Sequence, residues 1–217
     1  GGVFSATFDV QMPSEPTEVL VTVSLDEQSL DTTVEVTTLV VGGLVLSEVY
    51  YDSPGEDGGK EWIKLYNASG ETIDLTGYSL GWGGTDWTYG TLDLSGTVEP
   101  WSCVVIGGPT SSGDNGNPAF DISVNLEPDL QNGGSKADGV ALFEVPAFEL
   151  TNQTIPVDVV LYGTENGSNL VGPDGTNAPV HTDDVPSGFS LQRVSLEEWT
   201  TTDSPSPATC PALLPTP

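Results

Sequence analysis

The sequence predicts an all-β sandwich, and three observations support this prediction. Apolar and polar side chains alternate along many short segments, which is typical of strands with one buried face. The chain also holds 26 glycines and 17 prolines, many of which stand between these segments and mark turns. Hydrophobic residues make up 36% of the 217-residue chain, which is enough for a real core. We therefore expect short strands and very little helix.

Residues 1–43 are expected to form a first unit of three strands. These strands are expected at 3–10, 18–25 and 33–39, with a turn near 26–28. Three strands are too few to bury both faces of an independent sandwich. They are therefore either part of a larger domain or strands that add to the following sheet. Gly42-Gly43 is the expected hinge.

Residues 44–66 predict two strands joined by an acidic, glycine-rich loop. Alternation runs through 44–51 and again through 61–67, and the loop between them, 52–59, is rich in turn residues. Under strict alternation, Trp62 lies on the face opposite Ile63 and Leu65 unless a bulge intervenes. The stretch indicates a fold more clearly than a chemistry.

The rest of the chain continues this pattern. Further strands are expected at 78–80, 88–89, 103–106, 140–143, 157–162 and 189–194, which favours a sandwich. The polar, glycine-rich segment 107–139 is expected to form loops over the core. Residues 204–217 are rich in proline and are expected to form an extended tail or linker.

The charge of the chain excludes one class of partner. With 32 acidic residues against four basic ones, the net charge is -28. Such a surface repels nucleic-acid phosphates and has no basic stripe that could release counterions. No segment approaches the roughly 20 apolar residues of a membrane span. Solubility outside the cell, binding of divalent cations and a salty habitat would each suit the acidity.

The sequence holds two cysteines and one histidine, so a transition-metal site is nearly excluded. A bridge between Cys103 and Cys210 would close a loop of roughly 100 residues and stabilise the fold by about 4–5 kcal/mol. It would also fix the C-terminal tail to a core strand. Two separate thiols are the alternative.

Two acidic loops have ligands suited to Ca²⁺, which takes six to eight oxygens. The first offers Asp52, Glu56, Asp57 and Glu61, and the second offers Asp114, Asn117 and Asp121. The first lacks the spacing of the helix-loop-helix calcium motif. The alternative is a solvated turn, in which Lys60 neutralises a neighbouring carboxylate.

Two further patterns, a group of aromatic residues and the single histidine, have both a functional and a structural interpretation. Trp82, Trp87, Tyr89 and Trp101 could stack on sugars, although filling a sandwich core is the commoner use of such residues. His181 is followed by two aspartates and two serines. Because no G-x-S-x-G turn is present, we interpret it as a loop histidine.

Several motifs in order along the chain resemble the lamin-tail domain of the bacterial and archaeal secreted type. These motifs span 47–49, 61–67, 73–80, 104–107, 130–134, 138–142, 157–163 and 190–194, so the resemblance covers about residues 44–203. It implies an immunoglobulin-like β-sandwich without enzymatic activity. Residues 1–43 resemble the last strands of a bacterial immunoglobulin-like domain. The chain departs from the pattern at Lys64, where an acidic residue is usual, and in long insertions at 107–139 and 163–187.

The resemblance leads us to expect a non-catalytic module outside the cytoplasm, at the cell surface or secreted. Its expected partner is another protein or a component of the cell envelope, and no cofactor is expected apart from a possible Ca²⁺. Two alternatives remain open: a calcium- or carbohydrate-binding adhesion module, and an accessory domain of a secreted hydrolase.

Overall fold

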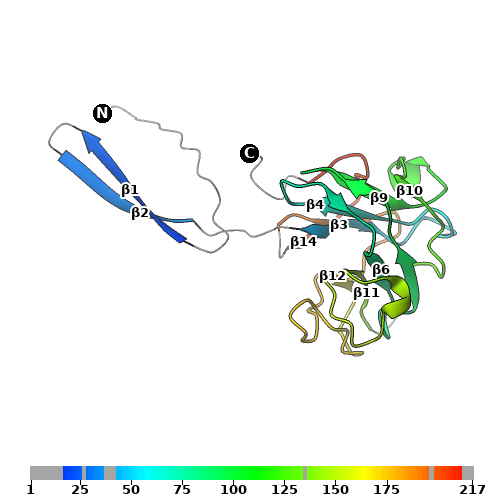
Figure 1. The fold of residues 1–217 in the computed structure, drawn as a ribbon. Coiled ribbons are helices and arrows are strands. Elements are labelled where there is room, and N and C mark those ends of the chain that lie inside the picture. Colours follow the sequence, from blue (N-terminus) through cyan, green and yellow to red (C-terminus); the bar gives the residue numbers. More distant parts are fainter. Residues whose placement is uncertain (1–16, 26–27, 37–42, 134–135, 196–197, 212–217) are drawn as a thin grey trace. The chain divides into compact units, whose positions relative to one another are not determined.

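The computed structural model describes residues 17–25, 28–36, 43–133, 136–195 and 198–211. The chain divides into two compact units, residues 1–42 and 43–217 (Figure 1). No helix of the described residues has the length and hydropathy needed to cross a membrane.

The first unit contains an antiparallel hairpin of β1 (Thr17–Leu25) and β2 (Gln28–Val36). Thr17 pairs with Val36 at one end, and Leu25 pairs with Gln28 at the other. Strand β2 thus begins where the sequence predicted a turn, because the hairpin connection is short. The predicted strand at 3–10 lies outside the described residues. Strands β1 and β2 form a two-stranded sheet of their own.

The second unit is a sandwich of two main sheets, which confirms the predicted fold class (Figure 1). Their strands pair antiparallel, except that β10 pairs with β9 in parallel. The larger sheet has the order β10-β9-β4-β3-β13-β14, the smaller has the order β12-β11-β6-β7, and β5 pairs with β8. The strands are β3 (Leu44–Tyr50), β4 (Trp62–Asn67), β5 (Ile73–Asp74), β6 (Ser79–Trp82), β7 (Gly90–Asp93), β8 (Thr97–Val98), β9 (Cys103–Gly107), β10 (Ile122–Ser123), β11 (Asp138–Phe143), β12 (Asp158–Tyr162), β13 (Ser190–Arg193) and β14 (Trp199–Thr202). Two short 3₁₀ helices, η1 (Gly113–Asn115) and η2 (Ala147–Glu149), lie in the connections.

The core fills the space between the two sheets. Its side chains come from alternate positions of both sheets, and fully buried examples are Leu46, Ile63, Leu65, Leu80, Leu142 and Val160. Burying each such side chain contributes about 1.5–3 kcal/mol. The alternation that predicted the strands is therefore the alternation that builds this core.

A β-bulge at Ser47 sets the register of β3. Pairing with β4 shifts between Leu46 and Glu48. As a result Leu46 and Val49 both belong to the central core, while Glu48 lies on the outer face of the larger sheet. Such a bulge leaves one residue unpaired and redirects those that follow it.

Trp62 lies on the outer face, opposite Ile63 and Leu65, as the alternation predicted. Its ring stacks on Tyr50 with 5.8 Å between ring centroids, and both pack with Val105. All three residues are buried. The outer face of the larger sheet is therefore covered, unlike that of many antiparallel sheets.

Candidate functional site

The covered outer face holds a buried ion pair between neighbouring strands. Lys64 Nζ on β4 lies 2.6 Å from Glu48 Oε2 on β3, and both residues are fully buried. Glu48 also accepts a hydrogen bond from Ser190 Oγ at 2.7 Å. Burial lowers the pKa of Lys64, and the Glu48 carboxylate opposes this shift. Such a pair persists only when further hydrogen bonds satisfy both ions.

The C-terminal segment 203–210, here called the strap, supplies those hydrogen bonds. Lys64 Nζ donates to the carbonyl oxygens of Ser206 and Thr209 at 2.7 and 2.8 Å. The backbone N–H and the hydroxyl of Ser206 both donate to Glu48, each at 2.9 Å. The strap therefore satisfies both charges of the ion pair.

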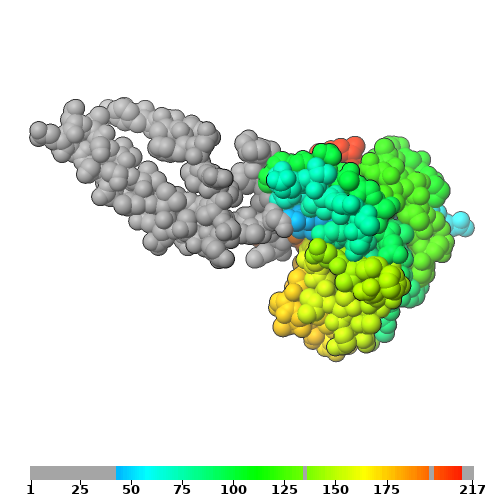
Figure 2. Space-filling view, in the orientation of Figure 1, coloured from blue at the N-terminus to red at the C-terminus, as the bar shows by residue number. Residues whose placement is uncertain are grey.

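A disulfide and a loop contact hold the strap in place. Cys103 on β9 is joined to Cys210, with 5.6 Å between the Cα atoms. A Cβ added at Gly116 would lie 2.7 Å from the Pro205 carbonyl oxygen and 2.8 Å from Pro207. The strap, in red in Figure 2, thus packs closely against the segment after η1. The sequence had predicted an extended tail here.

In the first predicted calcium loop, polar groups form hydrogen bonds with one another. Asp57 Oδ1 accepts the Ser53 N–H at 2.7 Å, and Lys60 Nζ donates to the Pro54 carbonyl oxygen at 3.2 Å. Glu56 is exposed, and Asp52 is half-buried. Burial raises the pKa of Asp52, and a hydrogen bond from Ser187 opposes this.

Glu61 differs from the other three candidates of this loop. It is 2% exposed, and its Oε2 accepts the Leu130 N–H at 2.9 Å. Its other oxygen, Oε1, is buried and has no hydrogen-bond partner. Burial raises the pKa of Glu61 to about 9, and the charges of Asp129, Asp57 and Asp52 add to the shift.

The second predicted calcium loop anchors η1 and β9. Asp121 Oδ2 accepts the Val105 N–H at 2.8 Å, and the Asp114 carbonyl oxygen accepts the Tyr50 hydroxyl proton at 2.8 Å. Asn117 is exposed and has a φ of 54°. Within the described ranges, no three His, Cys, Asp or Glu side chains lie close enough together to hold a metal ion. Calcium binding stays a prediction.

The side chains of the single histidine and of the aspartate and serine that follow it hydrogen-bond to different parts of the fold. His181 Nδ1 accepts the Leu161 N–H at 3.1 Å, and Asp184 Oδ1 accepts the Tyr51 hydroxyl proton at 2.8 Å. Ser190 is engaged with Glu48. A serine-histidine-aspartate constellation requires these side chains to hydrogen-bond in series. Here they make unrelated structural contacts.

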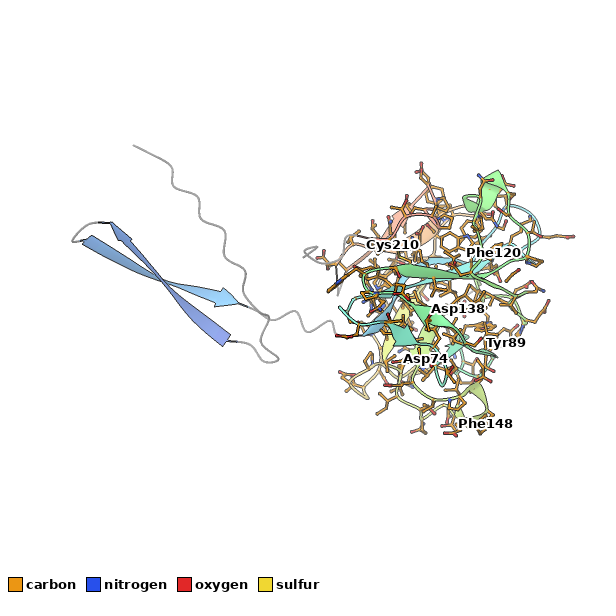
Figure 3. All side chains as sticks on the ribbon, turned by 45° about the horizontal axis from the view of Figure 1, so that its top comes forward. Asp74, Tyr89, Phe120, Asp138, Phe148 and Cys210 are labelled. Atoms are coloured by element: carbon orange, nitrogen blue, oxygen red, sulfur yellow. A yellow bond between two sulfur atoms is a disulfide. The ribbon has the colours of Figure 1, made fainter. Side chains whose placement is uncertain are left out.

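Two of the four aromatic candidates are buried rather than available for stacking. Trp82 and Trp87 are each 1% exposed, and their indole N–H groups donate to the carbonyl oxygens of Pro128 and Val171. Trp101 and Tyr89 are exposed. Tyr89 and Phe148, a further exposed aromatic, are labelled in Figure 3.

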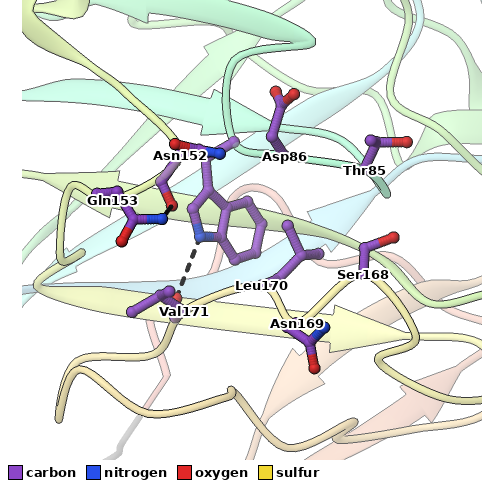
Figure 4. Close-up of a pocket in the computed structure, with 9 residues that line it drawn as sticks. Thr85, Asp86, Asn152, Gln153, Ser168, Asn169, Leu170 and Val171 are labelled. Carbon is purple, nitrogen blue, oxygen red and sulfur yellow. Dashed lines mark hydrogen bonds between the residues drawn. The ribbon is translucent and has the colours of Figure 1, made fainter.

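Polar side chains line a small cavity of about 160 Å³ around Trp87 (Figure 4). Asn152 and Gln153 approach it from the segment after η2, and Ser168 and Asn169 from the loop that follows β12. Trp87 is buried at this cavity, and its indole N–H donates a hydrogen bond to the Val171 carbonyl oxygen. Its volume is below that of a usual ligand pocket.

A second hollow, of about 590 Å³, lies beside β12. At its floor Arg193 Nη2 contacts both carboxylate oxygens of Asp158, at 2.7 and 2.9 Å. The Arg193 guanidinium also lies 4.9 Å from the ring centroid of Trp199. His181 completes the polar lining near this ion pair. Neither this hollow nor the Glu48–Lys64 pair was predicted, because both depend on contacts between residues distant in sequence.

The match to a protein-family model agrees with the sandwich. The Lamin Tail Domain family model matches residues 38–164, more than half of the chain. No curated protein matches. One solved structure is similar, that of a DUF4876 family protein from Bacteroides thetaiotaomicron; it shares 13% identity with a TM-score of 0.40 and covers 82% of this chain and 71% of that chain. The chain belongs to the lamin tail domain family.

Proposed function

We propose that this chain is a non-catalytic module outside the cytoplasm that holds or binds other proteins. The observation that carries the proposal is the covered outer face, where a disulfide fastens the strap over the Glu48–Lys64 pair. In this arrangement the ionisable side chains of Glu48 and Lys64 hold strands and strap together. It suits a domain whose task is to keep its shape while its surface contacts a partner.

The disulfide supports a location outside the cytoplasm. Cys103 is partly exposed and Cys210 is exposed, so cytosolic reductants would reach the bond. Disulfides persist in secreted proteins and at cell surfaces, and they are rare where thioredoxin and glutathione keep thiols reduced. A net charge of -28 also keeps a secreted protein soluble.

Thiol trapping in the producing cell tests this proposal. Intact cells are treated with a membrane-permeant maleimide before lysis, and the mass of the chain is then measured. We expect no label on the chain, because both cysteines are bridged. A chain that carries two labels in most molecules would refute the location outside the cytoplasm.

Calcium binding at the first acidic loop is the second candidate function, and Glu61 favours it. The Glu61 Oε1 atom is buried and unpartnered, and burial raises the pKa of Glu61, with a smaller contribution from three nearby aspartates. A divalent cation would provide the missing partner and offset the repulsion between these carboxylates. Calorimetric titration of Ca²⁺ into Glu61→Gln tests this, with Glu149→Gln on η2 as the charge-matched control outside the loop. Binding heats in Glu61→Gln equal to those of the control would exclude Glu61 as a ligand.

A further inference from the structure

Trp101 is the exposed tryptophan of this chain. The chain holds five tryptophans, and the other four, Trp62, Trp82, Trp87 and Trp199, are buried. Trp101 is 36% exposed. A large aromatic ring that reaches water leaves apolar area uncovered, which the fold avoids at the other four positions. Accessible tryptophans are frequent among the residues that contribute most to binding at protein interfaces.

The backbone of Trp101 has a conformation that suits glycine. Its φ is 57°, and the other described residues with a positive φ are glycines and two asparagines. The Ser102 N–H donates to the Glu99 carbonyl oxygen at 3.2 Å, which closes a β-turn. Pro100 is the second residue of this turn and Trp101 the third. Proline followed by a positive φ is typical of a type II turn, whose third residue is usually glycine or asparagine. A bulky residue there is strained, and such strain clusters at functional positions.

Buried hydrogen bonds hold this turn in place. Asn67, at the end of β4, is fully buried, and its Nδ2 atom donates to the Glu99 carbonyl oxygen at 3.1 Å. The Asn67 N–H donates to the Ser102 carbonyl oxygen at 2.9 Å. Cys103 follows directly and is bonded to Cys210. The indole ring is therefore presented on a rigid turn, which lowers the entropic cost of binding.

Carboxylates stand beside the turn without a cation from the same chain. Glu99 belongs to the turn, and Asn67 Nδ2 also donates to the Glu71 carbonyl oxygen at 2.7 Å, which brings Glu71 close to it. Both glutamates are exposed. The four basic side chains of the chain contact other residues: Lys60 contacts Pro54, Lys64 contacts Glu48, Lys136 contacts Ser168 and Arg193 contacts Asp158. The surface around Trp101 thus combines an exposed indole with negative charge.

We propose that Trp101 is the centre of a docking surface for a basic segment of a partner protein. A lysine or arginine of that segment lies on the exposed indole, whose ring quadrupole attracts it. Glu71 and Glu99 attract the same segment from the edge of this surface. A second copy of the chain, with its net charge of -28, would be repelled, so the partner is a different protein. The inference rests on the proposed function as an interaction module, and it names the surface and the chemistry of the partner.

Selection from a random-peptide display library on the immobilised chain tests the proposal. We expect enriched peptides to carry lysine or arginine, and Trp101→Asn should bind them at least roughly tenfold more weakly. Tyr89→Asn is the matched control, because Tyr89 is 48% exposed and lies in the connection between β6 and β7. This variant should bind as tightly as the parent. Asparagine adopts a positive φ more readily than tryptophan, so Trp101→Asn should melt no lower than the parent.

Quenching of tryptophan fluorescence by acrylamide, a neutral quencher, locates the bound peptide. Because the other four tryptophans are buried, the accessible emission comes mainly from Trp101. We expect an enriched peptide to protect this emission from acrylamide. In the absence of peptide, Trp101→Asn should lose most of the quenching seen in the parent.

Four outcomes would overturn the proposal. They are the absence of any enriched basic peptide, equal peptide binding by the two asparagine variants, quenching that the peptide leaves unchanged, and a melting temperature of Trp101→Asn several degrees below the parent, which would make Trp101 a packing residue. None of these would refute the location outside the cytoplasm, which depends on the thiol-trapping result. Binding of a glycan that requires Trp101, on an array probed with the same protein, would also count against a protein partner.

Discussion

Replacing Lys64 by methionine is expected to destabilise the sandwich strongly. The substitution keeps an unbranched apolar stem as far as Cε but removes the ammonium group that contacts Glu48, Ser206 and Thr209. Glu48 then stays buried without its countercharge, although Ser190 and Ser206 still donate to it. The pair is fully buried, so its loss is not softened by solvent as it is at the surface.

The expected magnitude follows from these contacts. Removing one partner of a buried ion pair costs about 3–5 kcal/mol. The Thr209 carbonyl belongs to an exposed residue and can bind water instead, which places the expected cost near the lower end, at about 3–4 kcal/mol. Lys60→Met is the control, because the Lys60 hydrogen bond to Pro54 is exposed. That variant should stay within about 0.5 kcal/mol of the parent.

Urea denaturation, followed by tryptophan fluorescence, measures the free energies of unfolding. The double variant Lys64→Met with Glu48→Gln should lose less than the sum of the two single losses, because it removes both charges. A Lys64→Met variant within about 1 kcal/mol of the parent would refute the buried ion pair as a stabilising feature. Strict additivity of the two substitutions would do the same.

Three further predictions concern the disulfide, Glu61 and the strap. Replacing Cys103 and Cys210 by serine should lower the free energy of unfolding by up to about 4–5 kcal/mol, because the bridge spans 107 residues. A melting temperature of the parent protein that reductant leaves unchanged would contradict this prediction. Burial raises the pKa of Glu61 to about 9, so the folded state holds a proton that the unfolded state releases above its ordinary pKa near 4.5. The free energy of unfolding should therefore fall as the pH rises between these two values. Glu61→Gln should flatten that fall, as measured by urea titrations at several pH values. Gly116→Ala should destabilise the protein more than Gly96→Ala. Both positions have a positive φ, but only the new Cβ at Gly116 contacts the strap. Equal melting temperatures of the two variants would show that the strap moves aside at no cost in stability.

The sequence predicted most strands of the sandwich because alternation is a local property. The segments 44–51 and 61–67 contain β3 and β4, and Trp62 occupies the face that alternation assigned to it. The family resemblance was confirmed by the family model over residues 38–164. These features depend on neighbours along the chain or on motifs within one strand.

Contacts across long sequence separations could not be predicted in this way. Ser206 reaches Glu48 across 158 residues, and no periodicity in the chain encodes that meeting. A signal was nevertheless present at Lys64, where the sequence departs from the acidic residue usual in the family. A lysine within a strand of so acidic a chain could have suggested an ion pair, but no pattern in the sequence named Glu48 as its partner or indicated that the pair is buried.

The two buried glutamates show why exposure cannot be read from alternation alone. Glu48 and Glu61 both stand beside apolar strand residues, and both are almost fully buried. Glu48 meets Lys64 and the donors of Ser190 and Ser206, so its charge is satisfied. Glu61 meets one backbone N–H and the charges of nearby aspartates, so burial favours its neutral form. The difference lies in the segments that cover each face. The strap brings the missing hydrogen bonds to Glu48, whereas Glu61 keeps one oxygen without a hydrogen-bond partner, so that burial raises its pKa.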